Sequence, residues 1–286
     1  VDAKTRERGL QAFCLAAIAS IIVSHMAQMN LLFHNPVLPR YPEYPGGFKF
    51  SITHSLIVGY AGFLFCLLAR DESRKWRRAL YIVIALAAAQ NVFFTVLSRT
   101  GYLVFEILLL YFVVATFGRR GITAALLLGA TLFCSAYIFS DTFRQRIGVA
   151  ASEITAWQPA QPSSTSVGLR LEFYATSLKI IGEHPLLGAG TGSFPMAYAR
   201  AVEGQNKVAT ENPHNEYLLI ATQIGIVGLA ALIYLFSQQW RYAGRLEQPL
   251  YRDLARGLML TFVVGCLFNS LLVDHTEGLL FAWLSG

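Results

Sequence analysis

One histidine of this sequence stands where a membrane-spanning helix is expected to begin, and its side chain could act as a base. Asn212, Pro213 and His214 precede an apolar run that continues to Phe236. Asn212 can cap a helix, and Pro213 suits its first position because the missing N–H of proline would be unpaired there anyway. These assignments place His214 in the first helical turn, at the water boundary. The electropositive helix end disfavours a charged imidazole, so His214 is available to accept a proton. An anchoring or capping role is the alternative.

The composition is that of a membrane protein with several spans. Hydrophobic residues make up 55% of the 286 residues and charged residues only 14%, and the mean hydropathy is +0.47. A soluble domain carries about 25% charged residues. The four cysteines occur singly inside apolar runs, which indicates neither a disulfide framework nor a zinc site. We therefore expect an all-α polytopic membrane protein.

The apolar runs have the length needed to cross a bilayer, and they predict eight spans. Seven are complete, at residues 10–27, 52–69, 80–97, 101–117, 122–140, 214–236 and 257–273, and the eighth begins at Leu279. We accordingly divide the chain into spans one to five (1–140), a long loop (141–213) and spans six to eight (214–286). The sequence lacks an initial Met and ends inside an apolar run, so we expect a fragment of a larger bundle.

Basic residues are concentrated in alternate connections, which predicts the orientation of the chain. The basic set is Lys4, Arg6, Arg8, Arg70, Arg74, Lys75, Arg77, Arg78, Arg119, Arg120, Arg241, Arg245, Arg252 and Arg256, whereas the other short loops hold only Arg40, Lys49 and Arg99. Because basic loops stay in the cytoplasm, the loop 141–213 is expected outside. Much of the net charge of +6 is then a signal of topology, and no nucleic-acid partner is needed to explain it.

The long loop divides into three parts. A short basic stretch, 141–147, contains Arg144 and Arg146, and the polar stretch 148–168 is expected to be mobile. Residues 169–181 have the spacing of an amphipathic helix, which we expect to lie in the membrane interface with Arg170 and Tyr174 on one face.

Three glycines, Gly188, Gly190 and Gly192, follow this helix and superficially resemble a phosphate-binding loop. No strand precedes them and no Lys-Ser or Lys-Thr pair follows, so a tight turn is the better interpretation. His184, just before Pro185, receives the same structural interpretation.

Two further groups of polar residues lie near predicted span ends. Arg99 is held at the boundary by a very short turn, and Glu106 follows on the same helical face. An acid inside a span needs a partner, so we expect a structural ion pair for Glu106 in preference to catalysis. Asp274, His275 and Glu277 cluster after the last full span. They could bind metal, Asp274 could orient His214 or an acceptor, or the cluster could simply be solvated.

Three motifs together resemble those of the O-antigen ligase and polymerase superfamily of the bacterial inner membrane, over about residues 80–240. They are Ser98-Arg99-Thr100-Gly101, then Arg170 followed by the stretch from His184 to Phe194, and Pro213-His214-Asn215-Glu216-Tyr217-Leu218 with Gly225 and Gly228. The resemblance implies a GT-C-like, inverting, metal-independent glycosyltransferase without cofactor, acting on the periplasmic side. The donor would be a glycan on undecaprenyl diphosphate, and for a ligase the acceptor would be a sugar hydroxyl of lipid A–core.

The chemistry of such a transfer fits the residues. His214 would take the proton of the acceptor hydroxyl. Arg99 and Arg170, with Arg144 or Arg146 in reserve, would bind the diphosphate bidentately. Supporting residues would be Asn215, Tyr174, Asp274 and Glu106.

Several alternatives stay open. Within the superfamily they are an O-antigen polymerase and a protein O-oligosaccharyltransferase. In another class, a transporter or flippase of lipid-linked sugar should show broken helices and polar sites near the midplane. The predicted spans read as largely unbroken, which favours the transferase.

Overall fold

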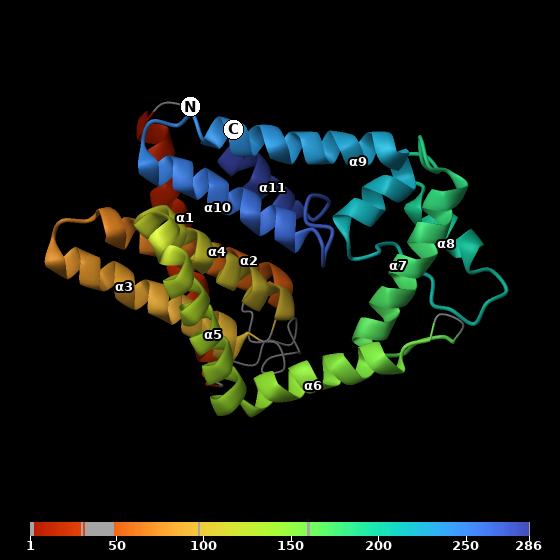
Figure 1. Cartoon of the computed structure of the whole chain (residues 1–286), viewed down its shortest axis with the longest axis horizontal. Helices are drawn as coiled ribbons and strands as arrows, with labels where there is room; N and C mark the ends of the chain where they lie inside the picture. The colour runs from red at the N-terminus through yellow and green to blue at the C-terminus, as the bar shows by residue number, and fades with distance from the viewer. Residues whose placement is uncertain (1–2, 30, 32–48, 97, 159–160, 286) are drawn as a thin grey trace. The chain divides into compact units, whose positions relative to one another are not determined.

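The structure is a computed structural model that describes residues 3–29, 31, 49–96, 98–158 and 161–285. Within these residues the chain is helical and contains no strand. The elements are α1 (Ala3–Gln28), α2 (Ser51–Asp71), α3 (Lys75–Gln90), the π-helix η1 (Asn91–Thr95), α4 (Arg99–Phe117), the 3-10 turn η2 (Gly118–Arg120), α5 (Gly121–Phe139), α6 (Asp141–Ala156), α7 (Ser166–Glu183), α8 (Phe194–Ala201), α9 (Glu216–Ala243), α10 (Pro249–Gly265) and α11 (His275–Ser285) (Figure 1).

Six described helices are long and apolar enough to cross a membrane, which confirms the all-α polytopic class. They are Lys4–Gln28, Ser51–Asp71, Lys75–Thr95, Arg99–Phe117, Gly121–Phe139 and Glu216–Ala243. The first five helices start one to six residues before the predicted spans and end within two residues of them, whereas the sixth starts two residues after the predicted span and ends seven residues beyond it. Arg40, one of the few basic residues in the loops expected outside, is not among the described residues.

The predicted seventh span, 257–273, is wrong. Helix α10 begins at Pro249 and ends at Gly265, a non-helical segment follows, and α11 begins at His275. The apolar run continues past Gly265, and hydropathy alone does not show where the backbone hydrogen bonds of the helix end. The carbonyls of Cys266 and Leu267 accept hydrogen bonds from the residues that start α9, instead of continuing α10.

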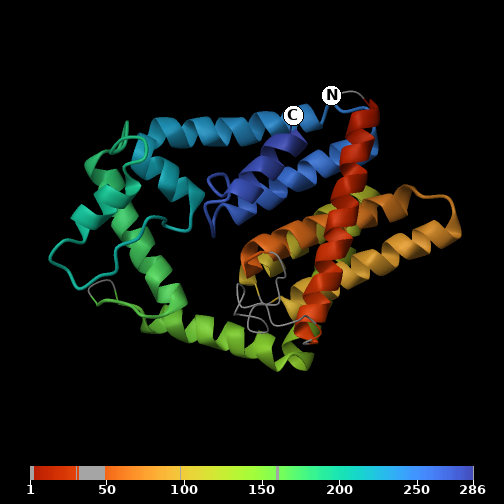
Figure 2. The same ribbon diagram turned by 180° about the vertical axis from the view of Figure 1, so that it is seen from behind.

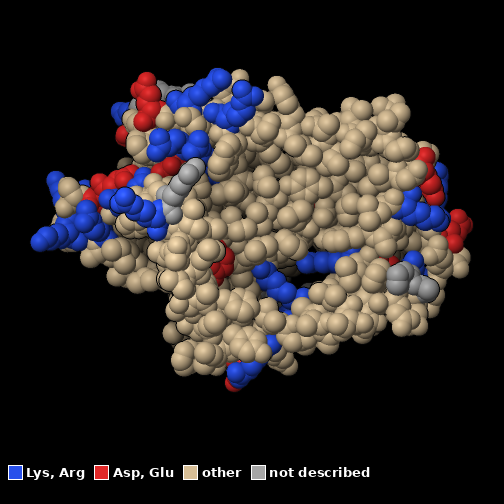
Figure 3. Space-filling model, in the orientation of Figure 1, with Lys and Arg blue, Asp and Glu red and all other residues tan. Residues whose placement is uncertain are grey.

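The chain forms two compact units, and unit 1 consists of Val1–Phe143 and Arg245–Thr261. Helix α2 lies at the centre of this unit. Of the residues in its most apolar 18-residue stretch, 78% are buried, and the helix packs against α1, α3 and α4. Arg70 at its end donates to the buried carboxylate of Asp253 on α10 at 2.8 Å. Lys and Arg gather over the connection between α2 and α3, and the helix faces beside it carry few charges (Figure 3).

A buried polar network joins α1, α2 and η1 in unit 1. The side chain of Asn91 bonds His54 Nε2 and Ser24 Oγ, both at 2.9 Å. Inside a membrane such groups must satisfy one another, because no water is present to do so. The network therefore ties the start of η1 to α1 and α2.

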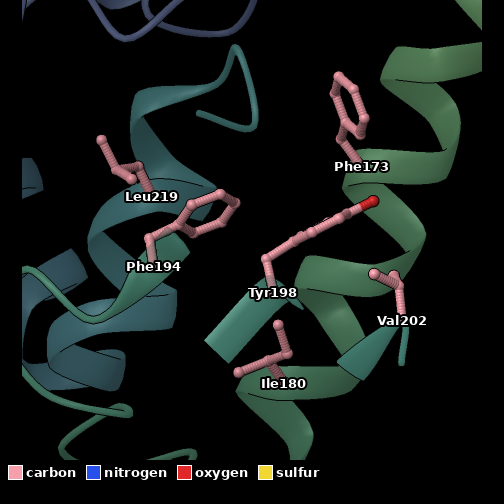
Figure 4. Packing of buried hydrophobic residues seen from close by; sticks show 6 residues of the cluster. All are labelled: Phe173, Ile180, Phe194, Tyr198, Val202 and Leu219. Carbon is pink, nitrogen blue, oxygen red and sulfur yellow. The ribbon is translucent and has the colours of Figure 1, made fainter. Parts of the chain in front are cut away.

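Unit 2 consists of Arg144–Gly244 and Phe262–Gly286, and its core lies among α7, α8 and the first part of α9. Tyr198 of α8 is fully buried and packs edge-on against Phe173 of α7, with ring centroids 5.8 Å apart. Figure 4 shows its hydroxyl directed toward α7, with Phe194 and Leu219 on the side of α9. Both whole-chain views show these three elements side by side (Figures 1 and 2).

Part of the long loop is more ordered than the sequence predicts. Helix α6 continues to Ala156, so the expectation that 148–168 is a mobile polar stretch is wrong for its first half. Helix α7 begins at Ser166, because the Thr165 hydroxyl caps it by accepting the Gly168 N–H at 3.2 Å.

Candidate active site around His214

His214 lies just before α9 and not in its first turn. Asn215 is the N-cap: its Oδ1 accepts the N–H of Leu218 at 3.0 Å, and Glu216 is the first helical residue. The predicted cap at Asn212 is therefore wrong. Asn212 instead accepts the His214 N–H at 2.7 Å and holds it in the left-handed region, at φ 54°. This conformation is uncommon outside glycine, and the surrounding contacts must maintain it.

The segment after α10 holds the start of α9 in place. Cys266 O accepts the Glu216 N–H at 2.9 Å, and Leu267 O accepts from Asn215 Nδ2 at 3.0 Å. In return, Glu216 Oε2 accepts the Leu272 N–H at 2.9 Å. Residues 266–274 therefore form one wall of the site.

The imidazole of His214 is half-buried and is oriented by that wall. Its Nδ1 lies 3.1 Å from Asn269 Oδ1, and Asn269 Nδ2 donates to Asp274 Oδ2 at 3.1 Å. On the other side the ring faces Phe173, with centroids 6.3 Å apart. Asp274 thus reaches His214 through Asn269, a residue that the sequence analysis missed. The one signal in the sequence was an amide side chain inside an apolar run.

Tyr174 and Arg170 approach the same place from α7. The hydroxyl of Tyr174 lies 3.2 Å from His214 O and 3.1 Å from Leu267 O. Burial raises the pKa of Tyr174, whereas the positive charge of Arg170 and a hydrogen bond with Asn215 oppose the increase. The half-buried Arg170 lies one turn before Tyr174 on the helix. Unit 2 therefore brings Arg170, Tyr174, His214, Asn215 and Asp274 together.

The other predicted site residues belong to α6 and α4. Arg144 and Arg146 are exposed on α6, and Arg99 and Glu106 belong to α4 of unit 1. Arg99 is half-buried in the first turn, where Ser98 caps the helix by accepting the Gly101 N–H at 3.2 Å.

The ion pair expected for Glu106 is not formed by the described residues. Its Oε1 is buried without a hydrogen-bond partner there, and its Oε2 faces α5 at Gly129, where a Cβ would lie only 2.8 Å away. The spacing in the sequence gives Arg99 and Glu106 a shared helical face but not a side-chain contact.

The acidic cluster after α10 separates into different surroundings. Asp274 is held by Asn269, His275 is exposed at the start of α11, and Glu277 is buried in its first turn. Across the described ranges, no three His, Cys, Asp or Glu side chains are grouped as metal ligands.

The glycine-rich stretch after α7 is a tight turn, as predicted. Gly188, Gly190 and Gly192 all have positive φ, between 70° and 113°. The amides that a phosphate would need are already used: Ala189 N–H bonds Thr222 O at 2.8 Å, and Gly190 N–H bonds Gln223 O at 2.9 Å. This loop therefore docks on α9.

Helix α9 is broken at Gly225, so the prediction of largely unbroken spans is wrong for this helix. Gly225 has φ 68° and ψ −160°, and the two segments of α9 meet at an angle (Figure 1). The backbone groups freed by the break are bonded to the glycine-rich loop, which leaves Thr222 O and Gln223 O with partners from the protein itself.

The chain matches a family of known proteins. The family model described as O-antigen ligase matches residues 84–233, more than half of the 286 residues. This match extends from α3 through Arg99, Arg170 and His214 to the second segment of α9. No curated protein matches the chain.

Proposed function

Because the chain belongs to the O-antigen ligase family, a family of membrane glycosyltransferases that act on lipid-linked glycans, we propose a specific reaction for it. It transfers a glycan from undecaprenyl diphosphate to a sugar hydroxyl of lipid A–core, with inversion and without a metal. The reaction takes place on the periplasmic side of the bacterial inner membrane. The observation that carries the proposal is the fixed imidazole of His214, whose backbone is bonded by Tyr174, with Arg170 one turn before Tyr174 on α7.

The proposed base is Nε2 of His214. Asp274 is an acceptor when ionised, so the amide of Asn269 must turn Nδ2 toward it and Oδ1 toward the imidazole. A carbonyl oxygen accepts, so Nδ1 carries the proton of the neutral ring and Nε2 keeps its lone pair. That lone pair takes the proton of the acceptor hydroxyl while its oxygen forms a bond to the anomeric carbon.

Arginine side chains receive the leaving group. As the bond from the anomeric carbon to the phosphate oxygen breaks, its electron pair stays on the lipid diphosphate and adds to the charge there. Guanidinium groups bind such an anion bidentately and stay protonated throughout. Arg170 is the first candidate because it lies on the helix that bonds the backbone of His214, and Arg99 is the second. The exposed Arg144 and Arg146 are the reserves.

The alternatives within the family differ only in the acceptor: a second lipid-linked glycan for a polymerase, or a Ser or Thr hydroxyl for a protein O-oligosaccharyltransferase. The break in α9 is the one observation that favours a transporter, since transporters use broken helices to bind substrate. Here the loop at 185–190 occupies the freed backbone groups, which supports the transferase.

A transfer assay with purified protein in lipid vesicles tests the proposal. Undecaprenyl-diphosphate glycan is the donor, and lipid A–core, a second lipid-linked glycan and a peptide are offered as acceptors. We expect product on lipid A–core, persisting in EDTA and lost with His214→Asn, which tolerates the left-handed conformation better than most residues. Product on another acceptor alone would identify a different family member. Passage of lipid-linked sugar across the vesicle without transfer would support the transporter.

A further inference from the structure

An apolar surface surrounds the break in α9, and it is formed by two segments distant in the sequence. Leu186 and Leu187 of the glycine-rich loop are 67% and 72% exposed, and Ile226 and Val227, just after the break, are 53% and 55% exposed. We call these four residues the break patch. Exposed apolar side chains grouped in this way mark a surface that contacts lipid or another protein.

Backbone contacts fix the loop to the helix at this level. The N–H groups of Ile226 and Val227 donate to the carbonyls of Pro185 and Leu186, at 2.9 and 3.4 Å. A Cβ on Gly225 would lie 2.3 Å from the carbonyl carbon of Leu186, so the two backbones touch where only glycine permits it. The exposure of the break patch is therefore a property of a fixed structure.

The length of α9 places the patch relative to the membrane. Its 28 residues amount to about 42 Å, whereas a bilayer core is about 30 Å thick. The part after the break, 226–243, amounts to about 27 Å and matches the core by itself. It also carries the exposed apolar residues Ile233, Tyr234 and Leu235, and the break patch continues this face.

The part before the break, 216–224, has a different character. It starts with the buried Glu216 and packs on α7 and α8, and the hydroxyl of Tyr217 donates to Val263 O of α10 at 2.8 Å. Its first residues are bonded to the polar segment 266–274. A helix with these surroundings does not need lipid around it.

We infer that the hydrocarbon of the membrane begins at Gly225 and that the break patch is immersed in the acyl chains of the adjacent leaflet. The loop at 185–190 then enters the leaflet as a short wedge. The amides of Ala189 and Gly190 donate to α9, in keeping with the need to pair non-helical backbone at this depth. Residues 216–224 and His214 stand in the headgroup layer. The inference concerns the resting protein and does not depend on the proposed reaction.

Spin labels at single cysteines test this placement. In a chain whose four native cysteines are replaced by alanine, and whose helix content matches that of the wild type, labels are attached at Leu187→Cys and Val227→Cys in lipid nanodiscs. Collision rates with oxygen and with a water-soluble nickel chelate report lipid and water exposure. Ile233→Cys provides the lipid reference, and the exposed Asn206→Cys provides the water reference.

We expect the ratio of oxygen to nickel collisions at residues 187 and 227 to lie clearly above that at 206 and below that at 233, because the ratio rises with depth in the hydrocarbon and residue 233 lies about two turns deeper on α9. A ratio like that of 206 would place the break patch in water and overturn the inference. Low collision rates with both reagents would also overturn it, because they would mean that protein, such as a second copy of the chain, covers the patch. Since no substrate is present, failure of the transfer assay would leave this result unaffected.

Discussion

The orientation of one imidazole depends on an amide, and the geometry predicts what happens when that amide is lost. In Asn269→Leu nothing would accept from Nδ1–H, so the ring of His214 should populate both tautomers. Turnover should then fall by as much as the roughly 10²- to 10⁴-fold that a general base contributes, with little change in KM. The tautomer is measured by ¹⁵N NMR of histidine-labelled protein, with the His214 signal identified by its loss in His214→Asn.

The matched control is Ser270→Ala. It removes the 2.7 Å hydrogen bond from Ser270 Oγ to Asn212 in the same wall but does not touch the ring. It should leave the tautomer as in the wild type. An unchanged tautomer in Asn269→Leu would show that Asn269 does not set the proton position, whatever its effect on activity.

Arg170 should be sensitive to the shape of its cation and not only to its charge. Arg170→Lys keeps the positive charge but loses the planar fork that binds two phosphate oxygens. We expect a loss of kcat/KM of about tenfold or more, measured with lipid-linked donor, and a larger loss in Arg170→Gln. Lys179→Gln, an exposed position on the same helix, is the control and should behave as the wild type. Equal activity of Arg170→Lys and the wild type would place the diphosphate elsewhere.

At the scale of elements, Gly188 and Gly225 allow the backbones of the glycine-rich loop and α9 to touch. In Gly225→Ala a methyl group would meet the backbone of Leu186 at 2.3 Å, and φ 68° would strain the residue itself. The loop must then leave the helix, which breaks four backbone hydrogen bonds between them. We expect a loss of more than about 1 kcal/mol in the free energy of unfolding, measured by thermal or denaturant unfolding in detergent.

Gly182→Ala provides the comparison for this element. Gly182 is helical and exposed in α7, and nothing lies within 4 Å of an added Cβ. Alanine should be neutral or stabilising there, by up to about 1 kcal/mol. Equal stability of the Gly225→Ala and wild-type proteins would show that the loop does not hold the break.

The sequence predicted what depends on local pattern. Hydropathy located six spans, and missing phosphate-loop features correctly identified the turn at Gly188. Prediction from the sequence failed where contacts between residues distant in the chain determine the structure. Asn212 and Asn215 are equally good caps by residue type, and only the bond from Asn215 to Leu267 selects the second. The break at Gly225 was missed because glycine is also frequent in unbroken spans. Asn269 gains its role from two neighbours in the folded site, one of them 55 residues away.

At the scale of the whole molecule, the distribution of basic residues predicts that the connection between α2 and α3 faces the cytoplasm and that the loop after α8 faces the periplasm. Exposed positions report both sides: Arg74→Cys for the first and Asn206→Cys for the second. In intact cells whose outer membrane is permeabilised, a maleimide that cannot cross the inner membrane should label residue 206 but not residue 74. After cell lysis it should label both, which controls for reactivity. The reverse pattern would place His214 on the cytoplasmic side, where neither the proposed donor leaflet nor the acceptor would be available to it.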